Sequence, residues 1–226
     1  MRSKNIKRAV KATLPVMAGY LVLGAGFGIV MKANGYGIGW ALAMSLFLYA
    51  GSMQYIGVGL LTSGVSLLSV ALTTLMVNAR HLFYGLSMVE KYQDAGAKKP
   101  YLIFSLTDET YSIVCSAEKD PDYYFLVSIL DQSYWVLGTA IGSVLGSVLR
   151  FNTEGIDFAL TALFLTVFTD QWLHGKQHFS AVCGVVVSVA CLLLFGPDRF
   201  LIPAMLIIAA ALVSKGYIKK EVKTDG

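Results

Sequence analysis

The chain has 226 residues, of which 56% are hydrophobic and 14% are charged, and its mean hydropathy is +0.64. Soluble domains typically carry about 25% charged residues, so this composition excludes an ordinary soluble protein and predicts a polytopic membrane protein in a lipid bilayer. The net charge of +4 comes from basic clusters that adjoin apolar segments, which argues against nucleic acid as the partner.

Eight apolar segments approach the roughly 20 residues that a helix needs to cross the hydrocarbon. In chain order they are residues 13–31, 38–60, 65–89, 101–117, 123–149, 158–173, 178–195 and 199–216. The fourth and the last three are short, so length alone leaves six, seven or eight crossings open. No polar segment is long enough for a separate soluble domain, and residues 1–226 are predicted to form one membrane domain.

Basic residues gather near both ends of the chain, within residues 2–11 and 215–223. By the positive-inside rule both termini are expected in the cytoplasm, which requires an even number of crossings.

Two halves of the chain, about 10–117 and 123–216, share matching residues in the same order. Residues 20–28 match 134–142, residues 46–55 match 163–172, and residues 69–71 match 188–190. The ordered agreement favours a duplicated unit over chance. Duplicated halves are typical of secondary transporters, which bind substrate between the halves near the midplane.

The basic loop at residues 90–100 indicates how the halves are related. If every segment crossed, Lys98 and Lys99 would lie outside, contrary to the positive-inside rule. They lie inside if the second segment breaks at Ala50–Gln54 and returns, and if its repeat breaks near residues 168–171. The predicted fold class is therefore an all-α polytopic membrane protein with an inverted repeat, six crossings and two re-entrant or broken helices. Eight plain transmembrane helices are the alternative.

The second segment carries Gly51, Ser52 and Gln54 midway along its length. A helix broken there frees backbone N–H groups, and a half-helix N-terminus suits a substrate carboxylate. The alternative is that these are small packing residues in an unbroken helix. The repeat of Gln54 at Gln171, next to Asp170, favours the functional interpretation.

The third segment carries Asn78, Arg80 and His81 in an otherwise apolar run. An arginine at the centre of a membrane helix costs at least about 2.5 to 3.5 kcal/mol, so Arg80 needs a partner or a water-filled cavity, unless it snorkels to the surface. On a regular helix Arg80 points about 200° away from Asn78. We therefore interpret the three as gate or counter-ion residues near the inner mouth of a path, not as one ligand site.

The fourth segment places its polar residues on one face of a single predicted helix. They are Ser105, Asp108, Glu109, Ser112 and Ser116. Two adjacent carboxylates in an apolar setting cannot both ionise cheaply, so Asp108 or Glu109 is a candidate proton carrier. Alternatively both are counter-ions of Arg80 and Arg199, and the two roles are compatible.

The fifth segment opens with Asp131 and Trp135, four residues apart on one face. That face continues into glycines that form a ridge suited to close helix packing. The repeat pairs Gly24 with Gly138 and Gly28 with Gly142, so these four residues are predicted to pack the halves together. Trp135 could instead be an interfacial anchor.

Nothing in the sequence predicts a cofactor, a metal site or an enzyme. Cys115, Cys183 and Cys191 have no metal-ligand spacing, and there is no Gly-rich phosphate-binding loop and no catalytic triad spacing. Active transport would have to use an ion gradient or the energy of a separate subunit.

Four motifs occur in an order that is typical of one protein family, and the chain has about the length usual in that family. They are residues 50–54 (AGSMQ), 78–81 (NARH), 104–109 (FSLTDE) and 135–138 (WVLG). They resemble the AzlC-type large subunit of bacterial branched-chain amino acid exporters, over residues 15–173. Met53 is bulkier than the residue usual at that position in the family, which would alter the pocket.

The resemblance implies gradient-driven export of valine, leucine and isoleucine, with methionine as a further substrate, across the bacterial inner membrane. It also implies a small AzlD-type membrane subunit as partner. A channel-like facilitator and a non-transporting membrane subunit are the alternatives.

For an exporter, the residues give a mechanistic hypothesis. The substrate carboxylate meets Gly51 and Ser52, or Arg80, and the ammonium meets Asp108, Asp131 or Asp170. The aliphatic part lies against Tyr55 or Trp135, while Glu109 or Asp108 exchanges the proton.

Overall fold

The computed structural model describes residues 2–148 and, beyond them, 165, 168–169, 172–173, 178–196, 200, 203–204, 206–208, 210–211 and 214. The chain divides into two compact units, Met1–Leu160 and Thr161–Gly226. Every regular element in these described residues is helical, which confirms the all-α class. The second unit contributes one described apolar helix, α10 (Phe179–Phe195). The predicted breaks near residues 168–171, like Asp170, Gln171 and Arg199, lie outside the described residues.

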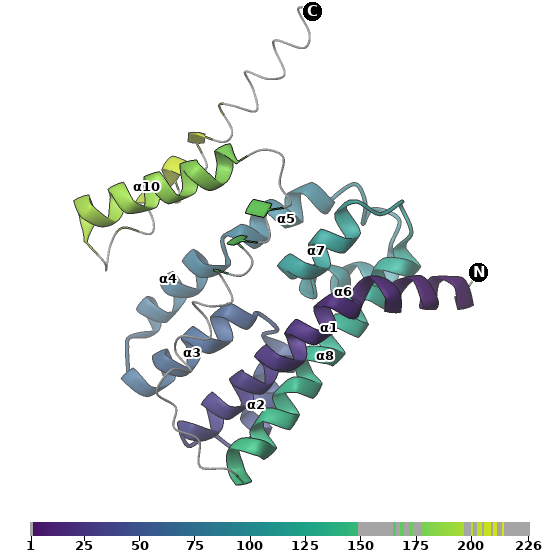
Figure 1. Ribbon diagram of the computed structural model, residues 1–226, viewed down its shortest axis with the longest axis horizontal. Helices are drawn as coiled ribbons and strands as arrows, with labels where there is room; N and C mark the ends of the chain where they lie inside the picture. The colour runs from purple at the N-terminus through teal and green to yellow at the C-terminus, as the bar shows by residue number, and fades with distance from the viewer. Residues whose placement is uncertain are drawn as a thin grey trace, which may run out of the picture. The chain divides into compact units, whose positions relative to one another are not determined.

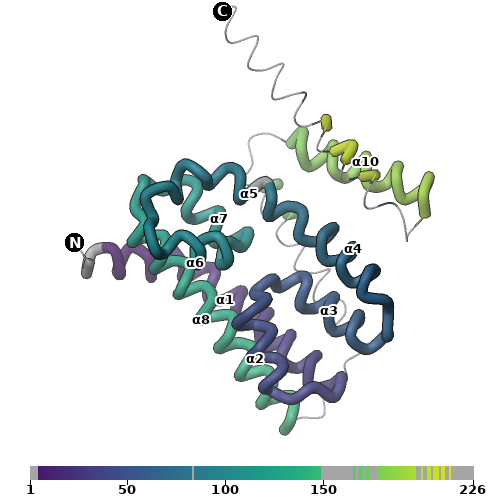
Figure 2. The backbone as a smooth tube through the Cα atoms, turned by 180° about the vertical axis from the view of Figure 1, so that it is seen from behind, coloured from purple at the N-terminus to yellow at the C-terminus, as the bar shows by residue number. Residues whose placement is uncertain are grey.

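The first unit is built along helix α1 (Arg2–Ala33) and helix α8 (Pro121–Val148), which lie side by side and run in the same direction (Figures 1 and 2). Residues 5–33 form one helix that is long and apolar enough to cross a membrane. A side-chain carbon on Gly24 would come within 2.7 Å of the Trp135 carbonyl oxygen, and one on Gly138 within 2.7 Å of the Leu21 carbonyl oxygen.

Gly28 and Gly142 lie still closer to the opposite backbone. A side-chain carbon on Gly28 would overlap Thr139, and one on Gly142 would overlap Ala25. The structure thus places the four ridge glycines where α1 and α8 touch. Because α8 is the counterpart of α1 in the predicted duplication and runs in the same direction, these two helices do not have the opposite directions that an inverted repeat requires.

The second predicted segment is broken, as expected, into α2 (Ile38–Phe47) and α3 (Gly51–Ser63). The break lies at residues 48–50, at the N-terminal edge of the predicted stretch. Tyr49 adopts a positive φ of 42° there, a strained conformation for a bulky residue. The tight turn sends α3 back, so that both open ends of this hairpin lie at the C-terminal end of α1 (Figure 1).

The third segment is also two helices, α4 (Leu67–Asn78) and α5 (Arg80–Met88). Ser66 caps α4 by accepting a hydrogen bond from the Ser69 N–H. Ala79 interrupts the helical hydrogen bonding but keeps helical dihedral angles, so α4 and α5 continue in nearly one line.

The prediction of one continuous helix over residues 101–117 is wrong. The structure has η1 (Gly96–Lys98), α6 (Lys99–Phe104) and α7 (Asp108–Cys115), with a break at residues 105–107. Thr107 caps α7 by accepting a hydrogen bond from the Thr110 N–H. The regular spacing of polar residues across Ser105 and Asp108 therefore does not describe one helical face.

Helices α6 and α7 also form a hairpin, which begins and ends at the same end of the first unit. Lys98, before α6, pairs with Asp122 at the start of α8, and Lys119, after α7, pairs with Asp94 at 2.6 Å. The Lys91 ammonium donates to the carbonyl oxygens of Val114, Cys115 and Ala117 and so closes the C-terminal end of α7. The α6–α7 hairpin thus enters the first unit from the end opposite to that of the α2–α3 hairpin (Figure 2).

Candidate functional site

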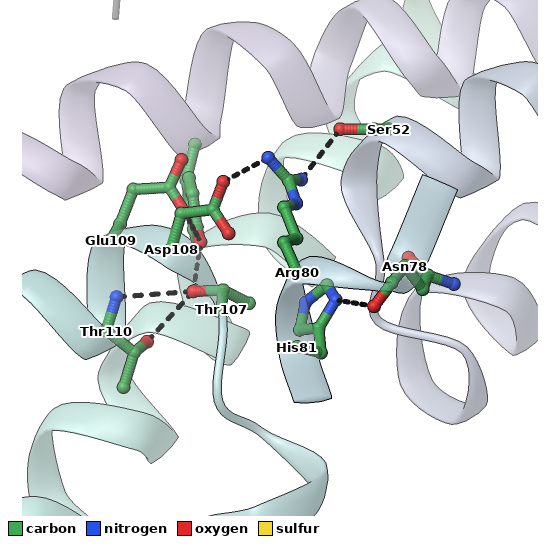
Figure 3. Close-up of polar contacts among 9 residues, drawn as sticks. Ser52, Asn78, Arg80, His81, Thr107, Asp108, Glu109 and Thr110 are labelled. Atoms are coloured by element: carbon green, nitrogen blue, oxygen red, sulfur yellow. Dashed lines mark hydrogen bonds and ion pairs between the residues drawn. The ribbon is translucent and has the colours of Figure 1, made fainter. Parts of the chain in front are cut away.

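The start of α5 brings Arg80 between the N-termini of α3 and α7 (Figure 3). Its guanidinium forms an ion pair with Asp108, the first residue of α7, and donates to the Ser52 hydroxyl at 3.2 Å. Both charged side chains are about one-third exposed, at 34% and 29%. The structure therefore gives the arginine a carboxylate partner well away from either end of α1 and α8.

The first turn of α3 combines a helix N-terminus with the indole of Trp135. A side-chain carbon at Gly51 would lie 2.9 Å from the Trp135 ring, so the ring approaches the backbone as closely as it does because residue 51 is glycine. The Trp135 Nε1 donor has no hydrogen-bond partner among the described residues. The N–H groups of the first helical turn have no partner within the helix and carry a partial positive charge. This turn can therefore receive an anionic group.

Gln54 lies one turn further along α3 and is fully buried. Its amide donates to the Ser45 hydroxyl at 3.1 Å, and Ser45 in turn bonds Thr139 at 2.9 Å. The amide oxygen Oε1 is left without a partner in the described structure. Gln54 therefore couples α3 to α2 and α8 and keeps one acceptor uncommitted.

Tyr55 does not join the other predicted substrate residues. Its hydroxyl donates to the Leu23 carbonyl oxygen at 2.6 Å, and its ring makes an edge contact with Phe27. Both partners are on α1, so Tyr55 fastens α3 to α1. Asp170 and Gln171 of the predicted set lie outside the described residues.

Glu109 and Asp131 are the two ends of a chain of hydroxyl groups. The Tyr20 hydroxyl lies 2.7 Å from both Glu109 Oε2 and Thr107 Oγ1. Thr107 donates to Thr110 at 3.1 Å, and Thr110 donates to Asp131 Oδ2 at 2.7 Å. Sequence reasoning missed the three hydroxyl residues. The only signal was local, since a threonine followed by two acidic residues is the pattern of a helix N-terminus.

His81 lies on the other side of Arg80. Its Nδ1 is 3.2 Å from the Asn78 carbonyl oxygen, and its ring contacts the edge of Tyr84. Arg80 and His81 thus point to different surroundings, as the 100° between consecutive residues on a helix allows.

Two cavities border the break between α2 and α3. The first, here the α5–α6 cavity, encloses about 350 Å³ and includes Asn78, His81, Gly85, Tyr92, Lys99 and Phe104 in its lining. The second, here the α2–α3 cavity, encloses about 460 Å³ and includes Met31, Trp40, Met44, Met53, Gly57 and Leu60. Leu48, Ala50 and Asn78 line both cavities. These three residues therefore separate two chambers.

The α5–α6 cavity ends at the loop after α5. Burial raises the pKa of the Tyr92 phenol there, and its neighbour Tyr124 adds to the effect. Tyr92 therefore presents a neutral hydroxyl. Lys99 also lines this cavity, so this end carries a basic residue. Among the residues that the structure describes, no three acidic, histidine or cysteine side chains gather closely enough to hold a metal ion.

A family model and one curated relative indicate the same family. The family model described as AzlC protein matches residues 15–149. The branched-chain amino acid transport protein AzlC of Bacillus subtilis is 44% identical over 211 residues, which cover 91% of this chain and 83% of that protein. An uncharacterized membrane protein of Haemophilus influenzae is 44% identical over 90% of this chain and 88% of its own length.

A more distant relative is the inner membrane protein YgaZ of Escherichia coli, 26% identical over 91% of this chain and 86% of its own. No solved structure matches the chain.

Proposed function

The chain belongs to the AzlC family of membrane transport proteins, and from this membership we propose that it exports branched-chain amino acids from the cytoplasm. The substrates are valine, leucine and isoleucine, with methionine as a fourth. The B. subtilis relative is named for branched-chain amino acid transport, which supports the substrate class. The direction and the proton coupling are our inference.

The observation that carries this proposal is the meeting of Arg80, Asp108 and the α3 N-terminus. An amino acid is a zwitterion, and these groups offer a complement to each of its charges. The substrate carboxylate binds Arg80 and the N–H groups of Gly51 and Ser52, and the ammonium binds Asp108. Asp108 Oδ1 is buried and has no hydrogen-bond partner in the described structure, which supports this role. In the absence of substrate, Arg80 and Asp108 neutralise each other's charge in their ion pair.

The apolar part of the substrate lies in the α2–α3 cavity, beside Met53. The cavity is lined mainly by apolar side chains, and ligand sites are commonly apolar with a few placed polar groups. Because the cavity and Gly51–Ser52 share the break at residues 48–50, one molecule can place its charged end at the break and its aliphatic end among the methionines.

The proposed membrane topology follows the two hairpins. Helix α1, the α4–α5 pair and α8 cross the membrane, while α2–α3 and α6–α7 enter from opposite sides. Lysines 91, 98, 99 and 119 lie at the end of the first unit where α1 begins, which is therefore the cytoplasmic end.

Export also needs a source of energy and a partner subunit. Glu109, adjacent to Asp108 and bonded to Tyr20, takes up the proton that drives export. A small AzlD-type membrane subunit completes the transporter, as the family resemblance implies.

The test is efflux of labelled valine, leucine, isoleucine and methionine from preloaded vesicles. The vesicles contain the chain with or without the small subunit, and efflux is measured with and without a pH gradient across the vesicle membrane. We expect saturable, uphill efflux that needs the gradient. Efflux that never exceeds equilibration would favour a channel-like facilitator, and no movement under any condition would favour a non-transporting subunit.

A further inference from the structure

Asp131 occupies an unusual place for a carboxylate. It lies in the middle of α8 with no exposed surface, and a buried charge is costly unless it is paired or neutralised. Its Oδ2 accepts one hydrogen bond, from Thr110. Its Oδ1 is buried without a partner in the part of the chain described here. Such a group is best satisfied when it can take up a proton.

The two hydrogen bonds nearest Asp131 both point toward it. Thr107 donates to Thr110, and Thr110 donates to Asp131. The contact between Tyr20 and Thr107 allows either oxygen to be the donor, so Tyr20 can donate to Thr107. When Glu109 is ionised, the same Tyr20 hydroxyl donates to Glu109 instead. Tyr20 therefore has one hydrogen and a choice of two acceptors, set by the protonation of Glu109.

We propose that Glu109 and Asp131 are the two ends of a proton relay, with Tyr20, Thr107 and Thr110 as its hydroxyl links. Carboxyl groups inside membrane segments commonly serve such relays. The role of the relay in coupling rests on the proposed export activity, whereas the proton path itself does not. Asp131 then carries a proton and is not a contact for the substrate ammonium.

The transfer balances at every atom. A proton on Glu109 passes to the Tyr20 oxygen as the Tyr20 proton passes to Thr107. The Thr107 proton passes to Thr110, and the Thr110 proton passes to Asp131 Oδ2. Each hydroxyl loses one O–H bond and gains another, so all three end neutral. Glu109 ends as a carboxylate and Asp131 as a carboxylic acid.

Several phenols from neighbouring elements lie near one or both of these carboxylates. They are Tyr20 on α1, Tyr49 at the α2–α3 break, Tyr84 on α5, Tyr101 on α6 and Tyr123 on α8. The Arg80–Asp108 pair lies beside Glu109 (Figure 3). Tyr49 is close enough to feel the charge on both Asp131 and Glu109, and it lines the α5–α6 cavity. Proton transfer to Asp131 would thus change the charge near Tyr49, at the tip of the α2–α3 hairpin that separates the two cavities.

The test follows the proton at Asp131 by infrared difference spectroscopy after a pH drop, on the full chain in lipid with its small subunit. We expect a carboxylic-acid C=O band that disappears in Asp131→Asn. In Tyr20→Phe and Thr110→Val, which remove one hydroxyl each, this band should form at least tenfold more slowly. Thr110→Ser, which keeps the hydroxyl, should restore the rate. Thr13→Val is the control, because it removes a buried hydroxyl of α1 outside the relay.

A labelled-valine assay on the same vesicles separates this proposal from the proposed function. Net efflux driven by a pH gradient should fall at least tenfold in Thr110→Val, while one-for-one valine exchange, which needs no net proton movement, should persist. If Asp131 protonation depends on Tyr20 and Thr110 but no vesicle exports amino acids, the relay stands and the export function falls. If wild-type vesicles export valine but no band depends on Asp131, or Thr110→Val forms it at the wild-type rate, the relay is overturned.

Discussion

Arg80 illustrates how one residue imposes structure on its neighbours. The cost of a central arginine in a membrane helix, at least about 2.5 to 3.5 kcal/mol, is met here by a carboxylate at the first residue of α7 and by the Ser52 hydroxyl. Both partners sit at helix starts created by breaks in the chain. The arginine and the two breaks therefore depend on each other.

Removing one member of the Arg80–Asp108 pair should destabilise the protein, because it leaves the other charge without its partner. Loss of one partner of a fully buried pair costs about 3 to 5 kcal/mol. Each of these side chains is about one-third exposed, so we expect about 1 to 3 kcal/mol for Arg80→Gln or Asp108→Asn. The double variant should be more stable than the sum of the single losses predicts, with a coupling energy of about 1 kcal/mol. Unfolding of the purified protein in detergent measures all three.

The matched control is the pair between Lys98 and Asp122, whose side chains are 37% and 70% exposed. Exposed pairs contribute about 0 to 1 kcal/mol, so Lys98→Gln and Asp122→Asn should change stability little. Additive losses at Arg80 and Asp108 would mean that the two residues act independently, and the pair would then not be the element that holds α5 against α7.

At the scale of elements, α1 and α8 pack closely against each other through their glycines. Gly142→Ala would place a methyl group into the Ala25 backbone, which cannot yield as a flexible side chain can. Overpacking typically costs about 1 to 3 kcal/mol. We expect Gly142→Ala to lower the thermal midpoint in detergent and the yield of folded protein.

Gly59→Ala serves as the control, since a side-chain carbon there meets nothing within 4 Å. It lies inside α3, where alanine favours the helix by up to about 1 kcal/mol over glycine. Its stability should therefore be unchanged or higher. A Gly142→Ala protein as stable as wild type would show that α1 and α8 can separate without loss.

The α6–α7 hairpin predicts that the two loops at its ends lie on the same side of the membrane. In a chain without its native cysteines, single cysteines at Lys98 and Lys119 should react with an impermeant maleimide added to the cytoplasmic side. Cysteines at Gly35 and Gly64, in the loops before α2 and after α3, should react from the other side. Opposite reactivity of positions 98 and 119 would instead mean that residues 99–115 cross the membrane.

The broken second segment could be predicted from sequence because glycine, serine and glutamine interrupt an apolar run, and a charged loop constrained its direction. The break at residues 105–107 was missed because Ser105, Asp108, Glu109 and Ser112 have helical spacing on both sides of it. Spacing cannot detect a turn that preserves it. A new helix, α7, begins after Thr107, whose side chain caps it.

The charged residues of the candidate site could be predicted from the sequence, whereas its neutral residues could not. Arg80 and Asp108 stand out because charges are rare in apolar segments. Tyr20, Thr107 and Thr110 are ordinary membrane-helix residues, and only the packing of α1, α7 and α8 brings their hydroxyls into one chain. Tyr55 matched a repeat but is bonded to Leu23, a contact between helices that no local pattern encodes.

At the scale of the whole transport path, the two cavities share Leu48, Ala50 and Asn78 as a common wall. A transporter that alternates its access must open one chamber while it closes the other, since a path open at both ends is a channel. The common wall is the tip of a hairpin with a strained residue, Tyr49, next to a helix interruption at Ala79. These are elements that can move without disturbing the α1–α8 contact.

Alternating access predicts opposite changes at two engineered cysteines, one in each chamber. Gly85→Cys lies in the α5–α6 cavity and should react with an impermeant maleimide from the cytoplasmic side, whereas Gly57→Cys lies in the α2–α3 cavity and should react from outside. Saturating valine on one side of the membrane should change the labelling rates of positions 57 and 85 in opposite directions and by a similar factor. Gly59→Cys, two residues from Gly57 and outside both linings, should not respond. Parallel changes at positions 57 and 85 would contradict alternation and favour a path open from end to end.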